Sequence, residues 1–592
     1  MIERAAVFHR STDPYAYPLN KTDLHIRIKT KRENVTSVEL IYGDQYDWVE
    51  NRWVTERISM ICTGTDALFD YWQAKVTPPS KRVRYGFLLQ NAHETVIMTE
   101  KGFFSDPPQD PSYYFCFPFL HDSEVFRAPD WVRETVWYQI FPERFANGDI
   151  QLNPNDTKPW GSEDPTLSNF FGGDFTGIMQ KLNYLQDLGI TGIYLTPIFK
   201  AHSNHKYDTI DYLEIDPQFG DKKTFKVLIE KCHEKGIRVM LDAVFNHSGY
   251  HFPPFQDVLK KGEQSPYKDW FHTNQFPLQG GKRPNYATFS FVETMPKLNT
   301  QNKKVKEYLL EVGRYWVREF NIDGWRLDVA NEIDHLFWRE FCAAVKEVKP
   351  DLYILGEIWH DSMPWLRGDQ FDSVMNYPFL TNTIHFFAKG IGSPREFVEQ
   401  MTTVIHQYPD TVNESLFNLV GSHDTPRLLT ECNNHVAKAK LIYTFLLTFI
   451  GTPCLFYGDE VGLTGGMDPE CRKCMPWEVR EQNLELFTHI QRLIELRKKE
   501  PLLANKGSFR FLCVDKGIAY VKTEDRRKII VILNPFDNEL KFTLPFPLKS
   551  KKITDLFKKQ EYMMESDELV ALIKPYDASI LLFSDDYDAV SD

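Results

Sequence analysis

Four short polar stretches, each following a predicted strand, carry acidic residues in this chain of 592 residues. Where the strands of a barrel end, such side chains meet in the active-site mouth. Four carboxylates at one opening repel one another, so a purely stabilising role for all of them would be costly. The pattern therefore predicts a catalytic site with paired acids. In chain order, its acids are Asp242, Asp328, Glu357 and Asp424.

Hydrolysis of a glycosidic bond requires two carboxyl groups, one on either side of the anomeric carbon. We expect Asp328 to be the ionised nucleophile, because Arg326 is two residues away and points to the same side of the strand. Glu357 precedes Ile358 and Trp359, an apolar setting that raises a carboxyl pKa and suits a proton donor. Neighbouring strands carry the two acids, which favours the separation of about 5–5.5 Å of a retaining mechanism.

The elements that position these acids alternate between strand and helix. Apolar residues from Phe175 to Leu188 recur at helical spacing, and Gly189 ends that predicted helix. A second helical pattern, 225–232, is ended by Gly236. Eight strands separated by such stretches predict an α/β fold, a (β/α)8 TIM barrel. The predicted strands are 136–141, 190–199, 237–245, 324–329, 352–358, 373–377, 417–420 and 454–457.

Short β-type runs flank the barrel on both sides. Runs at 24–28, 38–42 and 82–89 predict an N-terminal β-sandwich over residues 1–125. The barrel then occupies 126–505, with a small lobe at 248–299 inserted after its third strand, since that connection is too long for an ordinary loop. Runs at 509–514, 518–521, 528–533 and 579–583 predict a C-terminal β-sandwich over 506–592.

Composition and charge exclude several classes of partner. A net charge of −13 argues against nucleic acid and against an anionic membrane surface. No stretch is apolar enough to span a membrane, and the first residues lack the apolar region of a secretory leader, so we expect a cytoplasmic protein. Nine scattered cysteines indicate reduced thiols, and the pair Cys471 and Cys474 is interpreted as two incidental thiols.

The four polar stretches, in this order and at these barrel positions, resemble the α-amylase family of glycoside hydrolases over essentially the whole chain. The resemblance implies Asp328 as nucleophile, Glu357 as general acid/base and Asp424 as a third carboxylate that binds sugar hydroxyls. It implies that Arg326 holds the nucleophile. Further predicted substrate contacts are His205, Tyr207, which stacks under the sugar, Asp242, His247, Tyr377 and His423.

Within the family, the chain is most similar to the neopullulanase, cyclomaltodextrinase and maltogenic amylase group. The segment 295–299, the residues 329–332 and the N-terminal domain carry this likeness. This likeness implies cleavage of α-1,4 bonds in cyclomaltodextrins and short maltodextrins. It also implies pullulan and starch as further substrates, and transglycosylation as a further reaction. Predicted aromatic contacts on the aglycone side are Phe289 and Trp359, and the pair Asp468 and Arg472 closes the glycone side.

The same likeness implies a homodimer and a structural calcium ion. In the group, the N-terminal domain narrows the cleft of a second subunit, and the loop 45–48 is our candidate for the contact. Carboxylate, amide and carbonyl oxygens are ligands that calcium prefers. A turn without metal stays open as the alternative. The predicted calcium ligands are Asn147, Asp149, Asn153, Gly172 and Asp174.

Two other functions stay open at this point. One is a sucrose- or trehalose-type isomerase or a transglycosylase on the same barrel, although the N-terminal domain and the segment 295–299 argue against it. The other is a non-catalytic, glycan-binding member of the family. The presence of Asp328, Glu357 and Asp424 argues against this second alternative.

Overall fold

The centre of the protein is a closed barrel of eight parallel strands. The computed structural model describes residues 1–512, 516–543, 552–563 and 570–584. The strands run in the order β20-β19-β18-β17-β14-β13-β22-β21, and a parallel bridge between Met375 and Phe417 joins the two ends. The predicted TIM barrel is confirmed. Its strands are β13 (Trp137–Ile140), β14 (Gly192–Leu195), β17 (Arg238–Ala243), β18 (Gly324–Leu327), β19 (Tyr353–Gly356), β20 (Ser373–Val374), β21 (Phe417–Leu419) and β22 (Thr452–Phe456).

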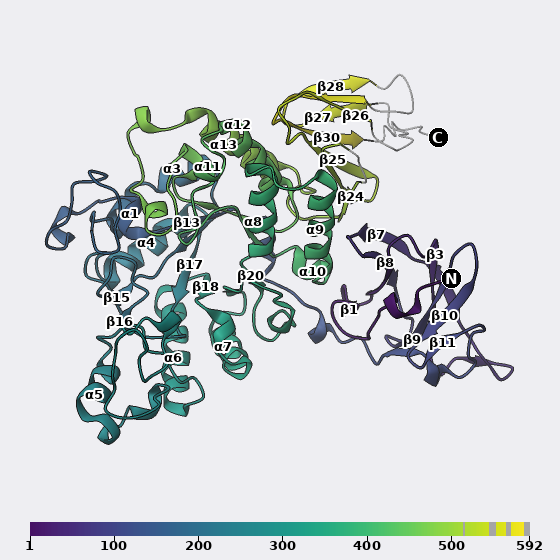
Figure 1. Cartoon of the computed structure of the whole chain (residues 1–592), viewed down its shortest axis with the longest axis horizontal. Helices are drawn as coiled ribbons and strands as arrows, with labels where there is room; N and C mark the ends of the chain where they lie inside the picture. Colours follow the sequence, from purple (N-terminus) through teal and green to yellow (C-terminus); the bar gives the residue numbers. More distant parts are fainter. Residues whose placement is uncertain (513–515, 544–551, 564–569, 585–592) are drawn as a thin grey trace.

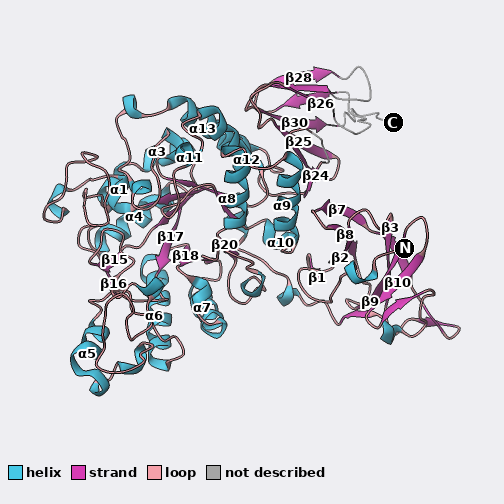
Figure 2. Cartoon of the chain, viewed as in Figure 1, coloured by secondary structure: helices cyan, strands magenta, loops and turns pink. Residues whose placement is uncertain are grey.

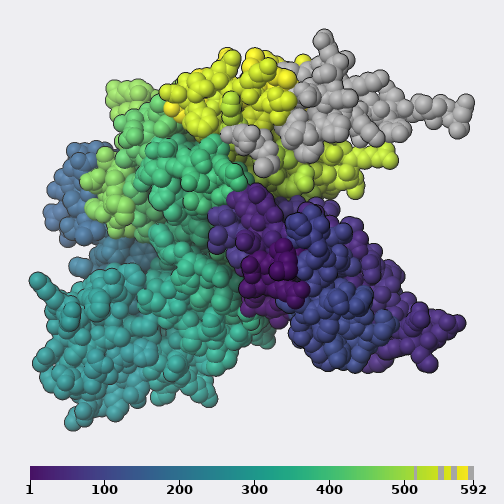
Figure 3. Space-filling view, turned by 45° about the vertical axis from the view of Figure 1, so that its right-hand side comes forward, coloured from purple at the N-terminus to yellow at the C-terminus, as the bar shows by residue number. Residues whose placement is uncertain are grey.

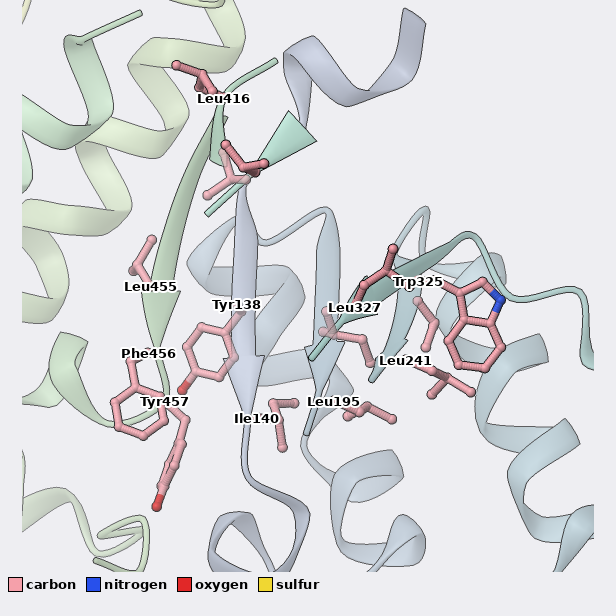
Figure 4. Close-up of a cluster of buried hydrophobic side chains, with 14 of the residues drawn as sticks. Tyr138, Ile140, Leu195, Leu241, Trp325, Leu327, Leu416, Leu455, Phe456 and Tyr457 are labelled. Carbon is pink, nitrogen blue, oxygen red and sulfur yellow. The ribbon is translucent and has the colours of Figure 1, made fainter. Parts of the chain in front are cut away.

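Both faces of the barrel strands are buried, which is why their sequences are nearly continuous apolar runs. Alternate residues belong to two separate apolar clusters. Trp137 of β13 and Tyr353 of β19 stack inside the barrel, with ring centroids 5.6 Å apart, although their strands are not neighbours. Tyr138, Ile140 and Leu195 belong to the other cluster, which packs against the helices (Figure 4).

Helices cover the outside of the barrel (Figure 2). The helix predicted from Phe175 to Leu188 is two helices, because the chain turns at Lys181, whose N–H bonds to the carbonyls of Ile178 and Met179. Gly189 ends the second with φ of +98°. The longer outer helices are α2 (Phe175–Gln180), α3 (Leu182–Leu188), α4 (Lys222–Glu234), α6 (Lys303–Phe320), α7 (His335–Val348), α8 (Tyr377–Thr383), α9 (Pro394–His406), α12 (Val436–Thr448) and α13 (Leu484–Lys499).

Two connections bear on the site. Strand β20 is shorter than predicted: Tyr377 is the first residue of α8, and the Asn376 side chain caps that helix by accepting from Phe379 N–H. Between β17 and α6 the chain leaves the barrel and forms α5 (Pro253–Lys261) with three 3₁₀ turns. Bridges such as that between His247 and Lys297 bring this excursion back to the barrel mouth.

The N-terminal β-domain packs against the barrel helices α9 and α10 (Asp410–Asn413), as Figures 1 and 3 show. The buried Arg27 forms an ion pair with the partly exposed Asp410, and the rings of Tyr71 and His406 stack 4.2 Å apart. One sheet contains β1 (Ala16–Pro18), β2 (Leu24–Lys31), β8 (Phe69–Val76) and β7 (Ile61–Thr65); the other contains β11 (Gly102–Phe104), β10 (Thr95–Thr99), β9 (Val83–Gln90), β3 (Ser37–Gly43), β6 (Glu56–Ser59) and β12 (Phe115–Phe117).

The C-terminal β-domain follows α13 and packs on α12 (Figure 1). Its pairs are antiparallel. The predicted strand 509–514 is β23, which ends at Phe511; Val514 lies outside the described residues. The main sheet is β23 (Ser508–Phe511), β24 (Ile518–Glu524), β25 (Arg527–Leu533), β30 (Ala578–Ser584), β27 (Lys552–Asp555) and β28 (Gln560–Met563), beside a pair of β26 (Leu540–Thr543) and β29 (Val570–Ile573).

Within the described ranges, no helix has both the length and the apolar character needed to cross a membrane.

Candidate active site

A cavity of about 400 Å³ opens where the barrel strands end. Its walls come from loops after seven of the eight strands, so residues far apart in the sequence meet there. All three predicted catalytic acids line it. The lining residues are Leu167, His205, Tyr207, His247, Phe289, Met295, Asp328, Val329, Asn331, Glu357, Trp359, His423, Asp424, Asp468 and Arg472.

Arg326, on β18, lies beneath this cavity and pairs with three carboxyl groups. Its Nη1 is 2.7 Å from Asp328 Oδ1 and 3.0 Å from Asp242 Oδ1. Its Nη2 is 2.7 Å from Glu357 Oε1. The guanidinium is fully buried, so these interactions are little screened by water. One planar cation therefore fixes the positions of two cavity acids and of the acid below them.

Burial acts on the pKa values of the acids in and below the cavity. Burial raises the pKa of Asp328 well above its ordinary value and outweighs the opposing effect of Arg326. Burial likewise raises the pKa of Asp242 to about 6 and raises that of Asp424. Glu357, expected in an apolar setting, instead shares the guanidinium with Asp328. Asp328 and Asp242 share the Arg326 cation, and the negative charge of Asp242 also raises the pKa of Asp328.

The backbone at Val329 holds Glu357 from the neighbouring strand. Val329 N–H donates to Glu357 Oε2 at 2.9 Å. Val329 itself has φ of +45° and ψ of 44°, a left-handed conformation that is costly for a β-branched residue. This strained turn directs the amide of the residue after Asp328 toward Glu357.

A network of Tyr207 and His423 borders the acids. Tyr207 Oη lies 2.9 Å from Asp242 Oδ2 and 2.6 Å from His423 Nε2, and the two rings are parallel within 2°. His423 Nδ1 contacts Gln139 Nε2 at 2.7 Å. Burial lowers the pKa of His423 well below its ordinary value, so this imidazole is neutral.

Two further histidines have the same character. His247 Nε2 lies 3.1 Å from the carbonyl oxygen of Tyr207, and its ring stacks on Phe289 at 5.1 Å. Burial lowers the pKa of His247 to about 3 and that of His205 to about 4. Neutral imidazoles can donate and accept hydrogen bonds with sugar hydroxyls without adding charge to the cavity.

At one end of the cavity, Arg472 ties the third acid to a further aspartate. Its Nη1 is 2.9 Å from Asp468 Oδ1 and its Nη2 is 3.4 Å from Asp424 Oδ1. Its Nε donates to the carbonyl of His423 at 2.9 Å, and the Cys471 thiol donates to the same oxygen at 3.2 Å. The thiol of Cys471 thus helps to hold this end wall.

Trp359 lies across the cavity with half of its side chain exposed, and it stacks on Tyr377 with ring centroids 3.5 Å apart. Three residues predicted to contact substrate are not part of the cavity surface: Asp242 and Arg326 lie beneath it, and Tyr377 supports Trp359 from behind.

Four lining residues were not predicted as site residues. Met295, Val329 and Asn331 belong to the segments that mark the family group. They are close in sequence to Phe289 or Asp328, and this closeness is the signal that could have identified them. Leu167 lies in a long loop between β13 and α2 without regular hydrophobic periodicity. Nothing local in the sequence marks it.

The predicted calcium ligands gather around the start of α2. Asn147 Oδ1 is buried without a hydrogen-bond partner among the described residues, and Asn153 Oδ1 contacts Asn147 Nδ2 at 3.0 Å. Gly172, with φ of +82°, approaches both amides so closely that a Cβ there would lie 2.2 Å from Asn153 Oδ1. These oxygens fit a hard cation. Asp174 accepts three backbone N–H groups, those of Gly148, Asp149 and Gly177, and so caps α2.

Comparison with known proteins agrees with this geometry. A family model described as the catalytic domain of alpha amylase matches residues 139–506, and one described as its N-terminal ig-like domain matches 1–121. The chain belongs to the α-amylase family of glycoside hydrolases. The family assignment made from the sequence is confirmed.

Several relatives match nearly the whole chain. A maltogenic alpha-amylase of Bacillus acidopullulyticus is 56% identical over 585 residues, 98% of this chain and 100% of the relative. A cyclomaltodextrinase of Geobacillus thermopakistaniensis (strain MAS1) is 56% identical over 97% and 98% of the two chains. An intracellular maltogenic amylase of Bacillus subtilis (strain 168) is 47% identical over 90% and 91%. A solved cyclomaltodextrinase superposes with a TM-score of 0.94 at 47% identity, over 98% of this chain and all of the other.

Proposed function

We propose that this protein hydrolyses α-1,4-glucosidic bonds of cyclomaltodextrins and short maltodextrins with retention of configuration. The observation that carries the proposal is the meeting of Asp328, Glu357 and Asp424 on one cavity. The names of the relatives, cyclomaltodextrinase and maltogenic amylase, support the substrate class. From the likeness to the neopullulanase, cyclomaltodextrinase and maltogenic amylase group, we propose pullulan and starch as further substrates and transglycosylation as a further reaction.

In the proposed mechanism, the carboxylate of Asp328 attacks C1 of the sugar and forms a glycosyl-enzyme ester. The carboxylic acid of Glu357 gives its proton to the departing glycosidic oxygen. The resulting carboxylate then takes a proton from water, which hydrolyses the ester, and Asp328 leaves with its charge restored. Asp424 accepts hydrogen bonds from sugar hydroxyls and stabilises the distorted ring. Burial raises the pKa of Asp328, whereas the ion pair with Arg326 favours the ionised form that attacks C1.

The test is product analysis with β-cyclodextrin. We expect ring opening followed by release of maltose and glucose, with the α-anomer formed first in proton NMR. Asp328→Asn and Glu357→Gln should each reduce turnover by about 10³-fold or more. Full turnover by Glu357→Gln would refute the acid/base role, and trehalulose-type isomers made from sucrose would favour the isomerase alternative.

We propose in addition that calcium binds beside α2. Asn147 and Asn153 would supply amide oxygens, Gly172 a carbonyl oxygen and Asp149 a carboxylate. The carboxylate of Asp174, the fifth predicted ligand, accepts three backbone N–H groups at the start of α2. The bound ion would stabilise the loop between β13 and α2 and takes no part in bond cleavage. Adding a chelator should lower the melting temperature of the protein but leave that of an Asn147→Ala, Asn153→Ala variant unchanged. An identical response of both proteins would contradict the site.

We propose that the protein is a homodimer in the cytoplasm, built through the N-terminal domain. The loop 45–48 carries exposed aromatic side chains, with Tyr46 70% and Trp48 46% exposed, which suits burial against a second copy. A relative named intracellular maltogenic amylase supports the location. In sedimentation, Tyr46→Ala with Trp48→Ala should shift the protein toward monomer, whereas Leu336→Ala, exposed on α7, should not.

A further inference from the structure

A second hollow, of about 620 Å³, lies beside the cavity of the catalytic acids. It is formed by residues 164–168 of the loop between β13 and α2 and by Pro469, Glu470 and Lys473 of the loop after β22. Leu167 lines both hollows. Of two consecutive residues in the loop after β22, Asp468 lines the catalytic cavity and Pro469 lines the second hollow.

The boundary between the two hollows lies at one end of the catalytic cavity. Leu167 follows β13 and Asp468 follows β22, and these two strands are neighbours in the barrel. Phe289 and Trp359 follow β17 and β19, on the opposite arc of the rim. A linear chain lying across the acids therefore runs from the two aromatic rings toward Leu167.

The loop that carries Leu167 is fixed in position. Asn169 Oδ1 accepts from Thr166 N–H at 2.8 Å, and Asn169 Nδ2 donates to the carbonyl of Asp164 at 3.0 Å. Asn204, after β14, donates to the carbonyls of Asn169 and Thr166 at 2.8 and 3.1 Å. These bonds brace the backbone on both sides of Leu167, so the point from which its 62% exposed side chain projects is fixed.

The chemistry of the second hollow suits a sugar. Asp164, Ser168 and Glu470 offer oxygens to hydroxyl groups. Pro469, which is partly exposed, offers apolar surface to the C–H face of a pyranose ring. Lys473 is paired with Asp164 at 3.4 Å, so the hollow has no free positive charge directed at an anion.

We propose that Leu167 is a partition between the catalytic cavity and a further sugar-binding groove formed by residues 164–168, Pro469, Glu470 and Lys473. The ion pair of Asp468 and Arg472 lines the same cavity and closes this end beside Leu167. Next to this fixed pair, the size of the side chain at position 167 limits how many glucosyl units fit on this side of the cleaved bond. With leucine, the substrate ends at the partition and a short product is released. With a smaller residue, the chain continues into the groove and a longer product is released. The proposal rests on the hydrolase function proposed above.

A size series at position 167 tests the partition. Leu167→Phe, Leu167→Ala and Leu167→Gly are compared with the unchanged protein on maltohexaose, and initial products are separated by chromatography. We expect the ratio of maltotriose to maltose to rise in the order Phe, Leu, Ala, Gly, by about threefold or more between Leu and Gly. Ile150→Ala, an exposed apolar residue early in the same connection, is the matched control and should leave the ratio unchanged. An equal ratio throughout the series would overturn the proposal.

A second variant tests the groove itself. Ser168→Trp, added to Leu167→Ala, fills the groove with an indole and should return the ratio to that of the unchanged protein. Persistence of long products in the double variant would contradict the groove as their binding site. Ring opening of β-cyclodextrin, measured in parallel, separates the partition from the hydrolase function. If the unchanged protein opens the ring but the product ratio is the same throughout the series, the partition alone is refuted. If the unchanged protein does not open the ring, the hydrolase function is refuted, and the partition with it.

Discussion

Arg326 Nη1 lies 2.7 Å from Asp328 Oδ1, two residues further along the chain, and the same guanidinium pairs with Glu357 and Asp242. The two acids proposed for catalysis therefore share one rigid, fully buried cation. A flat fork can meet several carboxylates in defined directions, whereas an ammonium group cannot. Much of the precision of the site depends on this residue.

Replacing the fork by a point charge should reduce catalysis strongly. Arg326→Lys keeps the positive charge but loses the simultaneous contacts with Asp328 and Glu357, so we expect kcat/KM on β-cyclodextrin to fall by about 10²–10³-fold. Steady-state kinetics measure the effect. Arg318→Lys, on the exposed face of α6, is the control and should behave as the unchanged protein. Activity of Arg326→Lys within about threefold of the original would contradict the role of the guanidinium.

The acid below the cavity should shift the pH profile. The negative charge of Asp242 contributes to the raised pKa of Asp328. Asp242→Asn removes that charge, so ionised Asp328 becomes easier to form and its pKa falls. The acidic limb of kcat/KM should then move to lower pH, by roughly half a unit to one unit. A limb that stays in place or moves to higher pH would show that Asp242 does not act on the nucleophile in this way.

A buried glutamate outside the cavity should make the fold less stable as the pH rises from acid to neutral. Glu460 accepts hydrogen bonds from Tyr138 and Tyr184, and burial raises its pKa from 4.5 to about 7. Between these values the folded chain holds a proton that the unfolded chain has released, so stability falls as pH rises through this window. Glu460→Gln cannot release this proton, so the free energy of unfolding of the variant should fall by up to about 3 kcal/mol less over this pH range. Calorimetry should show that the melting temperature of the variant, relative to that of the unchanged protein, is higher at pH 8 than at pH 4.5. The same difference at both pH values would contradict the assignment.

The ion pair of Arg27 with Asp410 should contribute to the docking of the N-terminal domain. Arg27 has 3% of its side chain exposed, pairs with Asp410 and donates to the Tyr408 carbonyl at 2.6 Å. Arg27→Met removes one partner of Asp410, which keeps its contacts with His25 and Gln73, and should cost about 2–3 kcal/mol of unfolding free energy. Adding Asp410→Leu should restore most of that loss. Additive losses in this double-mutant cycle would show that the two residues do not interact.

The sequence by itself determined the class of the protein. Polar residues after apolar strands, spaced by helical stretches, predicted the barrel and the catalytic acids, because strand period and helix period are local properties of the chain. They also indicated Arg326 beside Asp328, since residues two apart on a strand point to the same side. The boundary of β20 was misplaced at Tyr377, where a capping asparagine starts a helix instead.

Only the tertiary structure decided how these residues share the site. The pKa of Asp328 depends on burial and on acids contributed by two other strands, which no local pattern records. The partition at Leu167 arises because the loops after β13 and β22 are neighbours in a closed barrel, although about 300 residues separate them in the chain. Local spacing fixes which chemistry is present, and the closure of the barrel fixes which groups meet.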